Sequence, residues 1–226
     1  MMAEVIIKLI IWLAVWLSVW KLFYLFNKRK MNYIEKYRLT ATFFFLISIL
    51  VVLVFRSDFY FFIKSSFQVL PFLFLVLLFI LNAMAYKYVG MFFPNYKKVF
   101  EMDSTLYFTK FDHKYLLSKS FELLYQQIMI SLLVVWLAKS NFSLSNIVLI
   151  FAFIFGLGHI LLFFQIKKSV ALFFLIASII SSFVFPFLIL KIEWGFVYSY
   201  IFHWIFYIIA GFIFIKVNKA VGLSST

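Results

Sequence analysis

Five polar side chains inside long apolar segments could carry chemistry in this chain, namely Glu122, Gln126, His159, His203 and Tyr207. An ionisable group at membrane depth is costly, so its presence points to a function. A carboxylate can accept a proton from water, and an imidazole can give or take one near neutral pH. At about 1.5 Å per residue from the expected cytoplasmic helix ends, all but the tyrosine lie roughly 6 to 18 Å deep. We therefore predict that the carboxylate, the amide and both imidazoles meet in one cavity open toward the cytoplasm.

Each of these residues also has a purely structural interpretation. Glu122 lies near the start of its expected helix, where the helix dipole favours a carboxylate. A lone histidine within a membrane often serves as a neutral hydrogen-bonding partner between helices, worth about 1 kcal/mol. The sequence also leaves open whether Glu122 or the neighbouring Phe121 faces the cavity.

The two histidines could instead bind a cofactor. His159 and His203 lie on separate expected helices, which suits a b-type haem. A zinc ion would need a third ligand, such as Glu122. The chain has no cysteine, which excludes thiolate sites and disulfides. The pattern therefore permits a metal at His159 and His203 but identifies no particular cofactor.

The elements that must position these residues are long apolar runs. Of the 226 residues, 66% are hydrophobic and 13% are charged, and the mean hydropathy is +1.09. A soluble chain carries about 25% charged residues. Since the runs are continuous and each is long enough to span a bilayer, we predict an all-α, polytopic membrane protein of about seven transmembrane helices. The runs lie at about 5–26, 39–55, 66–86, 117–138, 144–165, 169–190 and 195–215.

Basic residues between these runs predict the orientation. Fifteen of the 21 Lys and Arg residues fall on one side of a seven-span arrangement and five on the other. Because cytoplasmic connectors are rich in Lys and Arg, the N-terminus is expected outside and the C-terminus in the cytoplasm. The net charge of +13 is spread over these connectors. It therefore favours the lipid bilayer as partner rather than nucleic acid. The expected location is the cytoplasmic membrane of a bacterium or archaeon.

The polar residues divide the chain into two parts. Residues 1–116 are predicted to form three nearly apolar transmembrane helices and a cytoplasmic connector, at 87–118, that lies at the membrane interface. Residues 117–226 are predicted to form a four-helix core that holds the polar site. The first three helices would then serve as scaffold.

Three short motifs in the second part resemble the CAAX-prenyl-protease and bacteriocin-processing (CPBP, or Abi) family of intramembrane peptidases. That family carries Glu-Glu-x-x-x-Arg on one helix, Phe-x-x-x-His on the next, and His-x-x-x-Asn or Asp on a later one. Here the corresponding sequences are FELLYQ at 121–126, FGLGH at 155–159 and HWIFY at 203–207. The resemblance covers about residues 115–215, and it implies a catalytic set of Glu122, His159 and His203.

Three departures from the family pattern bear on activity. The first Glu of the pair, which the family uses to activate water, is replaced by Phe121, and the Arg position holds Gln126. Tyr207 stands at the Asn or Asp position, where it can still make one hydrogen bond. These changes favour a catalytically silent relative that acts through a membrane or envelope protein or peptide. The alternative is an active endopeptidase that cleaves a membrane-associated peptide.

Overall fold

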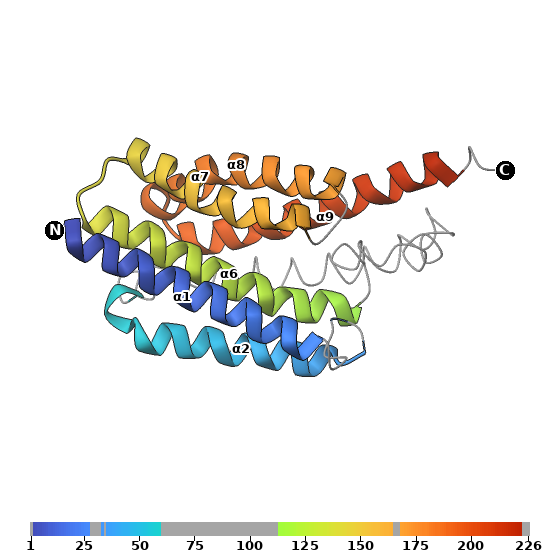
Figure 1. The fold of residues 1–226 in the computed structure, drawn as a ribbon, viewed down its shortest axis with the longest axis horizontal. Helices are drawn as coiled ribbons and strands as arrows, with labels where there is room; N and C mark the ends of the chain where they lie inside the picture. The colour runs from blue at the N-terminus through green and yellow to red at the C-terminus, as the bar shows by residue number, and fades with distance from the viewer. Residues whose placement is uncertain (1, 28–32, 34, 60–112, 165–167, 223–226) are drawn as a thin grey trace. The chain divides into compact units, whose positions relative to one another are not determined.

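A computed structural model describes residues 2–27, 33, 35–59, 113–164 and 168–222 of the chain (Figure 1). Within these ranges the chain is all helical and contains no strand, which confirms the all-α prediction for this part of the protein. The helices are α1 (Met2–Asn27), α2 (Tyr37–Val54), α6 (His113–Lys139), α7 (Leu144–Ile160), the 3-10 helix η2 (Leu161–Phe164), α8 (Lys168–Lys191) and α9 (Gly195–Gly222).

Six of the predicted apolar runs coincide with these α-helices. The run at 66–86 and most of the connector at 87–118 lie outside the described residues. Three boundaries differ from the prediction by four residues or more. Helix α6 begins at His113 rather than 117, and α9 continues to Gly222 rather than 215. Helix α7 ends at Ile160, and η2 replaces the expected last turn. A tighter 3-10 turn is frequent where an α-helix ends. His159 therefore lies in the last turn of α7 rather than in the interior of a longer helix.

Four of the described helices are long and apolar enough to cross a membrane, namely α1, α2, α6 and α8. The burial of α6 differs from that of α1, because 83% of its apolar window is buried, against 17% for α1. The sequence explains the difference. Helix α6 carries Glu122 and two glutamines in its apolar segment, and these cannot face lipid without losing hydrogen bonds. Helix α1 has no charged residue between Lys8 and Lys21, so that segment can face lipid.

The turn between α6 and α7 is built from residues suited to it. Asn141 adopts a left-handed φ of 61°, and the following Phe142 N–H donates to the Leu137 carbonyl at 3.3 Å. Asparagine tolerates this conformation and commonly ends helices. Ser143 then caps α7, since its Oγ accepts a hydrogen bond from the Asn146 N–H at 3.3 Å.

The turn between α8 and α9 requires a glycine at its end. Trp194 has a φ of 60°, and α9 begins at the next residue, Gly195. A Cβ atom on Gly195 would lie 1.8 Å from the carbonyl oxygen of Leu188, well inside van der Waals contact. Only a glycine therefore lets the chain approach the end of α8 this closely.

The chain divides into two compact units, and α2, α6 and α9 each contribute to both. The predicted division near residue 116 stays a prediction. Of the described residues, unit 1 comprises 2–25, 50–59, 126–164 and 168–199, and unit 2 comprises 26–27, 33, 35–49, 113–125 and 200–222.

Unit 1 is held by packing and by buried hydrogen bonds. Helix α7 lies against α8 (Figure 1). The Trp12 indole N–H donates to the Met129 carbonyl at 2.7 Å, which ties α1 to α6. Gln127 Nε2 donates to Ser199 Oγ at 2.6 Å, which ties α6 to α9. These bonds satisfy polar groups that would otherwise be costly in an apolar interior.

Candidate functional site

The centre of unit 2 is a buried ion pair on α6. Glu122 is 1% exposed and Lys119 is 3% exposed. The Lys119 Nζ donates to Glu122 Oε1 at 2.7 Å, three residues apart on the same helical face. Because both charges are removed from water, the pair is favourable only if further hydrogen bonds satisfy its remaining atoms.

Tyr33, from the segment between α1 and α2, supplies one of those bonds. Its hydroxyl donates to the second carboxylate oxygen of Glu122. Burial, together with the negative charge of Glu122, raises the pKa of Tyr33 well above its usual range, so the hydroxyl stays protonated and donates. The Tyr33 carbonyl in turn accepts a hydrogen bond from Ser118 Oγ at 3.2 Å. One tyrosine therefore fastens its segment to the first half of α6.

Aromatic rings surround the ammonium group of Lys119. The Nζ atom lies 4.1 Å from the centroid of the Tyr207 ring on α9 and 5.7 Å from that of Tyr33. A cation over a ring face is attracted by the ring quadrupole, more strongly when both are desolvated. The rings of Tyr33 and Tyr115 lie 5.6 Å apart, so a third tyrosine completes the group.

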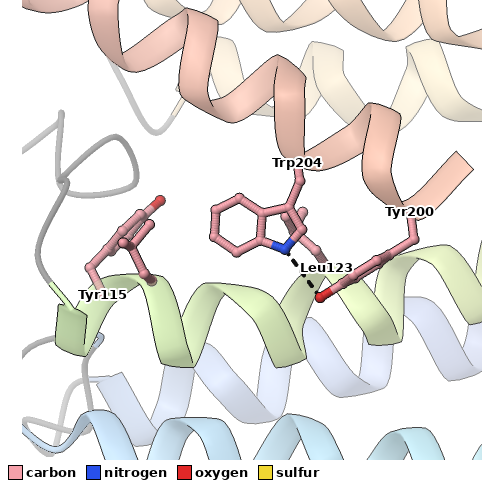
Figure 2. Packing of buried hydrophobic residues seen from close by; sticks show 5 residues of the cluster. Tyr115, Leu123, Tyr200 and Trp204 are labelled. Atoms are coloured by element: carbon pink, nitrogen blue, oxygen red, sulfur yellow. Dashed lines mark hydrogen bonds between the residues drawn. The ribbon is translucent and has the colours of Figure 1, made fainter. Parts of the chain in front are cut away.

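In the same unit, α6 and α9 share an apolar core (Figure 2). Tyr115, Leu123, Tyr200 and Trp204 are its best-buried members together with Leu116. The Trp204 indole N–H donates to the Tyr200 hydroxyl at 3.1 Å, and that hydroxyl donates to the Ser120 carbonyl at 3.0 Å. The buried Tyr115 hydroxyl has no hydrogen-bond partner among the described residues. The two helices are thus joined by both packing and directional bonds.

His203 enters the same unit through Tyr207. The two residues are four apart on α9, and their rings lie 5.5 Å apart at an interplanar angle of 34°. His203 is buried. Because Tyr207 also covers Lys119, the structure links Glu122 to His203 through one ammonium group and one phenol ring. Of the predicted site residues, it therefore brings Glu122, Tyr207 and His203 together in unit 2.

The question of whether Phe121 or Glu122 turns inward has a clear answer. The ring of Phe121 packs edge-on against Phe45 of α2, with centroids 5.2 Å apart, while the carboxylate of Glu122 is buried beside Lys119. The two side chains are about 100° apart around the helix, so they cannot both point the same way. Glu122 is the inward residue.

The other two predicted site residues, His159 and Gln126, belong to unit 1. His159 packs on Phe155, with ring centroids 4.9 Å apart, and its Nδ1 lies 2.8 Å from the Phe155 carbonyl oxygen. A carbonyl only accepts, so Nδ1 donates its proton in this contact. Gln126 is buried. In the described part of the chain, no three His, Cys, Asp or Glu residues are grouped in a way that could hold a metal ion.

The prediction from sequence missed Lys119, Tyr33 and Tyr115. Lys119 was expected to face lipid headgroups like the other connector lysines, but it is buried. Its spacing of three residues from Glu122 was a usable signal for an ion pair. Tyr33 lies 89 residues from Glu122, and no local pattern could have predicted that contact. The first part of the chain is therefore more than scaffold, since it supplies a partner of the carboxylate.

The arrangement determines what Glu122 can do chemically. Each of its oxygens accepts a hydrogen bond, from Lys119 or from Tyr33, so a water molecule would have to reach a remaining lone pair of a residue that is only 1% exposed. Although Gln126 lacks a positive charge, Lys119 supplies one beside the carboxylate. What the contacts achieve directly is to hold α6, α9 and the segment of Tyr33 together.

Comparison of the chain with protein-family models, with curated proteins and with solved structures finds no match. The resemblance to CPBP peptidases therefore stays a prediction from the motifs that contain Glu122, His159 and His203.

Proposed function

We propose that the chain crosses the cytoplasmic membrane of a bacterium or archaeon seven times, with the N-terminus outside. The four long apolar helices support membrane insertion. Helix α7 has 17 residues and spans about 26 Å, and η2 extends it to roughly the 30 Å of a hydrocarbon core. The excess of Lys and Arg on one side supports the orientation.

The absence of cysteine makes the orientation simple to test, because a single introduced cysteine is the only thiol. Ser140→Cys, between α6 and α7, should react with a membrane-impermeant maleimide in intact cells. Glu35→Cys, before α2, should react only after the cells are opened. The reverse pattern, or reaction of both in intact cells, would rule out the proposed orientation.

The function we propose is that of a CPBP-like membrane protein that no longer hydrolyses peptides and acts by binding a membrane or envelope protein. The observation that carries the proposal is the engagement of both Glu122 oxygens, by Lys119 and by Tyr33. Phe121, at the position where the family has its base, packs against Phe45 instead. A buried polar group that is paired internally holds the segments that share it together, which is what a binding protein requires.

The loss of hydrolysis can be tested in proteoliposomes. Wild-type protein and Glu122→Gln are incubated with a library of membrane-anchored peptides, and the products are compared by mass spectrometry. We expect the two product profiles to be identical. Cleavage that depends on Glu122 would contradict the proposal.

Binding can be tested by photo-cross-linking in cells. A benzophenone amino acid is placed at exposed positions of the described helices, such as Leu13, Leu46, Phe153 and Phe183, with buried Phe151 as the control. We expect one discrete protein adduct from adjacent positions of one face and none from Phe151. Adducts with lipid alone at every position would contradict a stable protein partner.

One observation favours the alternative, an active intramembrane endopeptidase. Glu122, the carboxylate that a peptidase of this kind would need, is the residue that turns inward. In that case Glu122→Ala, His159→Ala and His203→Ala should each abolish cleavage of a membrane-associated peptide while the helical content is unchanged. Persistence of cleavage in any of the three variants would exclude this mechanism.

A further inference from the structure

Two cationic side chains meet on one tyrosine at the start of two helices in unit 2. The Arg38 guanidinium carbon lies 5.7 Å from the centroid of the Tyr37 ring, and the Lys114 Nζ lies 5.9 Å from the same centroid. Two like charges beside one ring repel each other, and an anion close to both relieves the repulsion. Among the residues that the structure describes at these two helix starts, Lys36 adds a third positive charge and Glu35 one negative charge.

Arg38 is held with most of its donors pointing outward. Its Nε donates to the Tyr37 hydroxyl at 3.1 Å, and the side chain is exposed. Within the described ranges, the other guanidinium N–H groups of Arg38 make no hydrogen bond. A guanidinium fork fixed by one bond and open on its outer edge matches the geometry of phosphate oxygens.

These cations lie at the boundary between apolar helix and water. The spanning segments of α2 and α6 begin at Tyr37 and at Lys114. Tyrosine, lysine and arginine are enriched at this level, where lipid headgroups lie.

An apolar surface continues from the cations into the membrane. Phe45 lies seven residues after Arg38 and Phe121 seven residues after Lys114, so each shares a helical face with its cation. The Phe45 and Phe121 rings are in contact, with centroids 5.2 Å apart, so the two faces adjoin. At about 1.5 Å per residue, this ring pair is roughly 10 Å deeper than the cations, which is the level of acyl chains. Leu117, 38% exposed, lies between the two levels.

We propose that Tyr37, Arg38 and Lys114 bind the phosphate of an anionic phospholipid whose acyl chains lie along Phe45, Leu117 and Phe121. The site requires only that these helices lie in a membrane, so it is independent of whether the chain hydrolyses peptides. The adjoining apolar surface favours a lipid over free inorganic phosphate.

The test uses the full-length protein in a neutral detergent, titrated with fluorescent phosphatidylglycerol or with phosphatidylcholine of the same chain length. Wild-type protein should bind the anionic lipid at least tenfold more tightly. Arg38→Gln and Lys114→Gln should each weaken that binding about fivefold, because each cation near an anionic headgroup contributes about 1 kcal/mol. Lys191→Gln, at the end of α8, is the matched control and should bind as wild type does.

A charge-conserving variant and a competition experiment distinguish a bound lipid from bound inorganic phosphate. Arg38→Lys retains the charge but not the fork, so it should bind more weakly than wild type and more tightly than Arg38→Gln. Inorganic phosphate at millimolar concentration should not compete with the lipid. The proposal is overturned if the two lipids bind equally, if Lys191→Gln loses as much as Arg38→Gln, or if phosphate displaces the lipid. Circular dichroism confirms that each variant is folded.

Discussion

Removing one partner of the buried Lys119–Glu122 pair should destabilise the protein far more than removing both. Lys119→Met leaves a buried carboxylate with only the Tyr33 hydroxyl to stabilise it, and Glu122→Leu leaves a buried ammonium group among aromatic rings. An unpaired buried charge costs about 3–5 kcal/mol, so each single change should lower the free energy of unfolding by that amount.

The double variant Lys119→Met/Glu122→Leu should retain most of this stability. Replacing a buried ion pair by apolar side chains of similar volume is often neutral or stabilising. One cost remains, because the Tyr33 hydroxyl loses its acceptor, and an unsatisfied buried hydroxyl costs about 1–3 kcal/mol. The two single losses together should therefore exceed the double loss by at least about 3 kcal/mol.

The measurement is reversible unfolding by sodium dodecyl sulfate in mixed micelles, followed by the fluorescence of the six tryptophans. Lys8→Met is the matched control. Lys8 also pairs with a glutamate on its own helix at 2.7 Å, but that pair is exposed to solvent and should matter little. If Lys119→Met proves as mild as Lys8→Met, or the double variant loses the full sum, the two charges do not form a buried pair.

Three further predictions concern other contacts and use the same unfolding measurement. Tyr33→Phe removes the donor to the buried carboxylate and should cost about 1.5–3 kcal/mol, and no loss would show that the bond does not form. Gly195→Ala places a Cβ atom 1.8 Å from the Leu188 carbonyl oxygen and should cost about 1–3 kcal/mol or more, and a neutral result would exclude this backbone approach. Burial alone would raise the pKa of Asp58, but the hydrogen bond and charge of Lys139 outweigh it and hold that pKa below its ordinary 3.8. Since the pKa of Asp58 is lower in the folded than in the unfolded protein, the ion pair stabilises the fold at pH 7 and is lost in acid. Asp58→Asn should therefore lower the free energy of unfolding by under about 1 kcal/mol at pH 7, and the difference from wild type should vanish as the pH falls below 3.8. A difference that does not change with pH would contradict the ion pair.

The helices could be predicted from sequence because membrane insertion leaves a strong local pattern. An apolar run long enough to cross a bilayer has to satisfy its backbone hydrogen bonds internally, so it is helical. The six runs in the described residues are helices for this reason. The prediction ended α9 seven residues early and began α6 four residues late, because both helices extend into polar sequence. It was also wrong at the end of α7, where the chain tightens into η2 after Ile160 although the sequence stays apolar. Hydropathy cannot distinguish the two helix types.

The site was only partly predictable, since its contacts join distant parts of the chain. The polar residues of α6 identified the buried helix, because polar groups in a membrane protein turn toward other helices. The estimated depth along each helix was compatible with a shared site for Glu122 and His203. It contained no information on how each helix is rotated about its axis, or on the segment between α1 and α2. No sequence pattern therefore indicated Tyr33. Lys119 had a usable signal in its spacing of three residues from Glu122, but the prediction counted it among the lysines of the cytoplasmic connectors.

The strength of the Lys119–Glu122 pair also bears on the choice between a binding protein and a peptidase. If the pair is worth about 3 kcal/mol, fewer than about 1% of molecules have a free Glu122 carboxylate at any moment, since 1.4 kcal/mol is a factor of ten. A peptidase that needed this carboxylate free of Lys119 would be inhibited by its own lysine to the same extent. Lys119→Met should then raise the rate of cleavage in the fraction that stays folded, by up to about a hundredfold. For a binding protein the stability should fall in the same way, but Lys119→Met should reveal no cleavage. Measuring unfolding and the cleavage of the membrane-anchored peptide library with this one variant therefore separates the two functions without knowledge of the natural substrate.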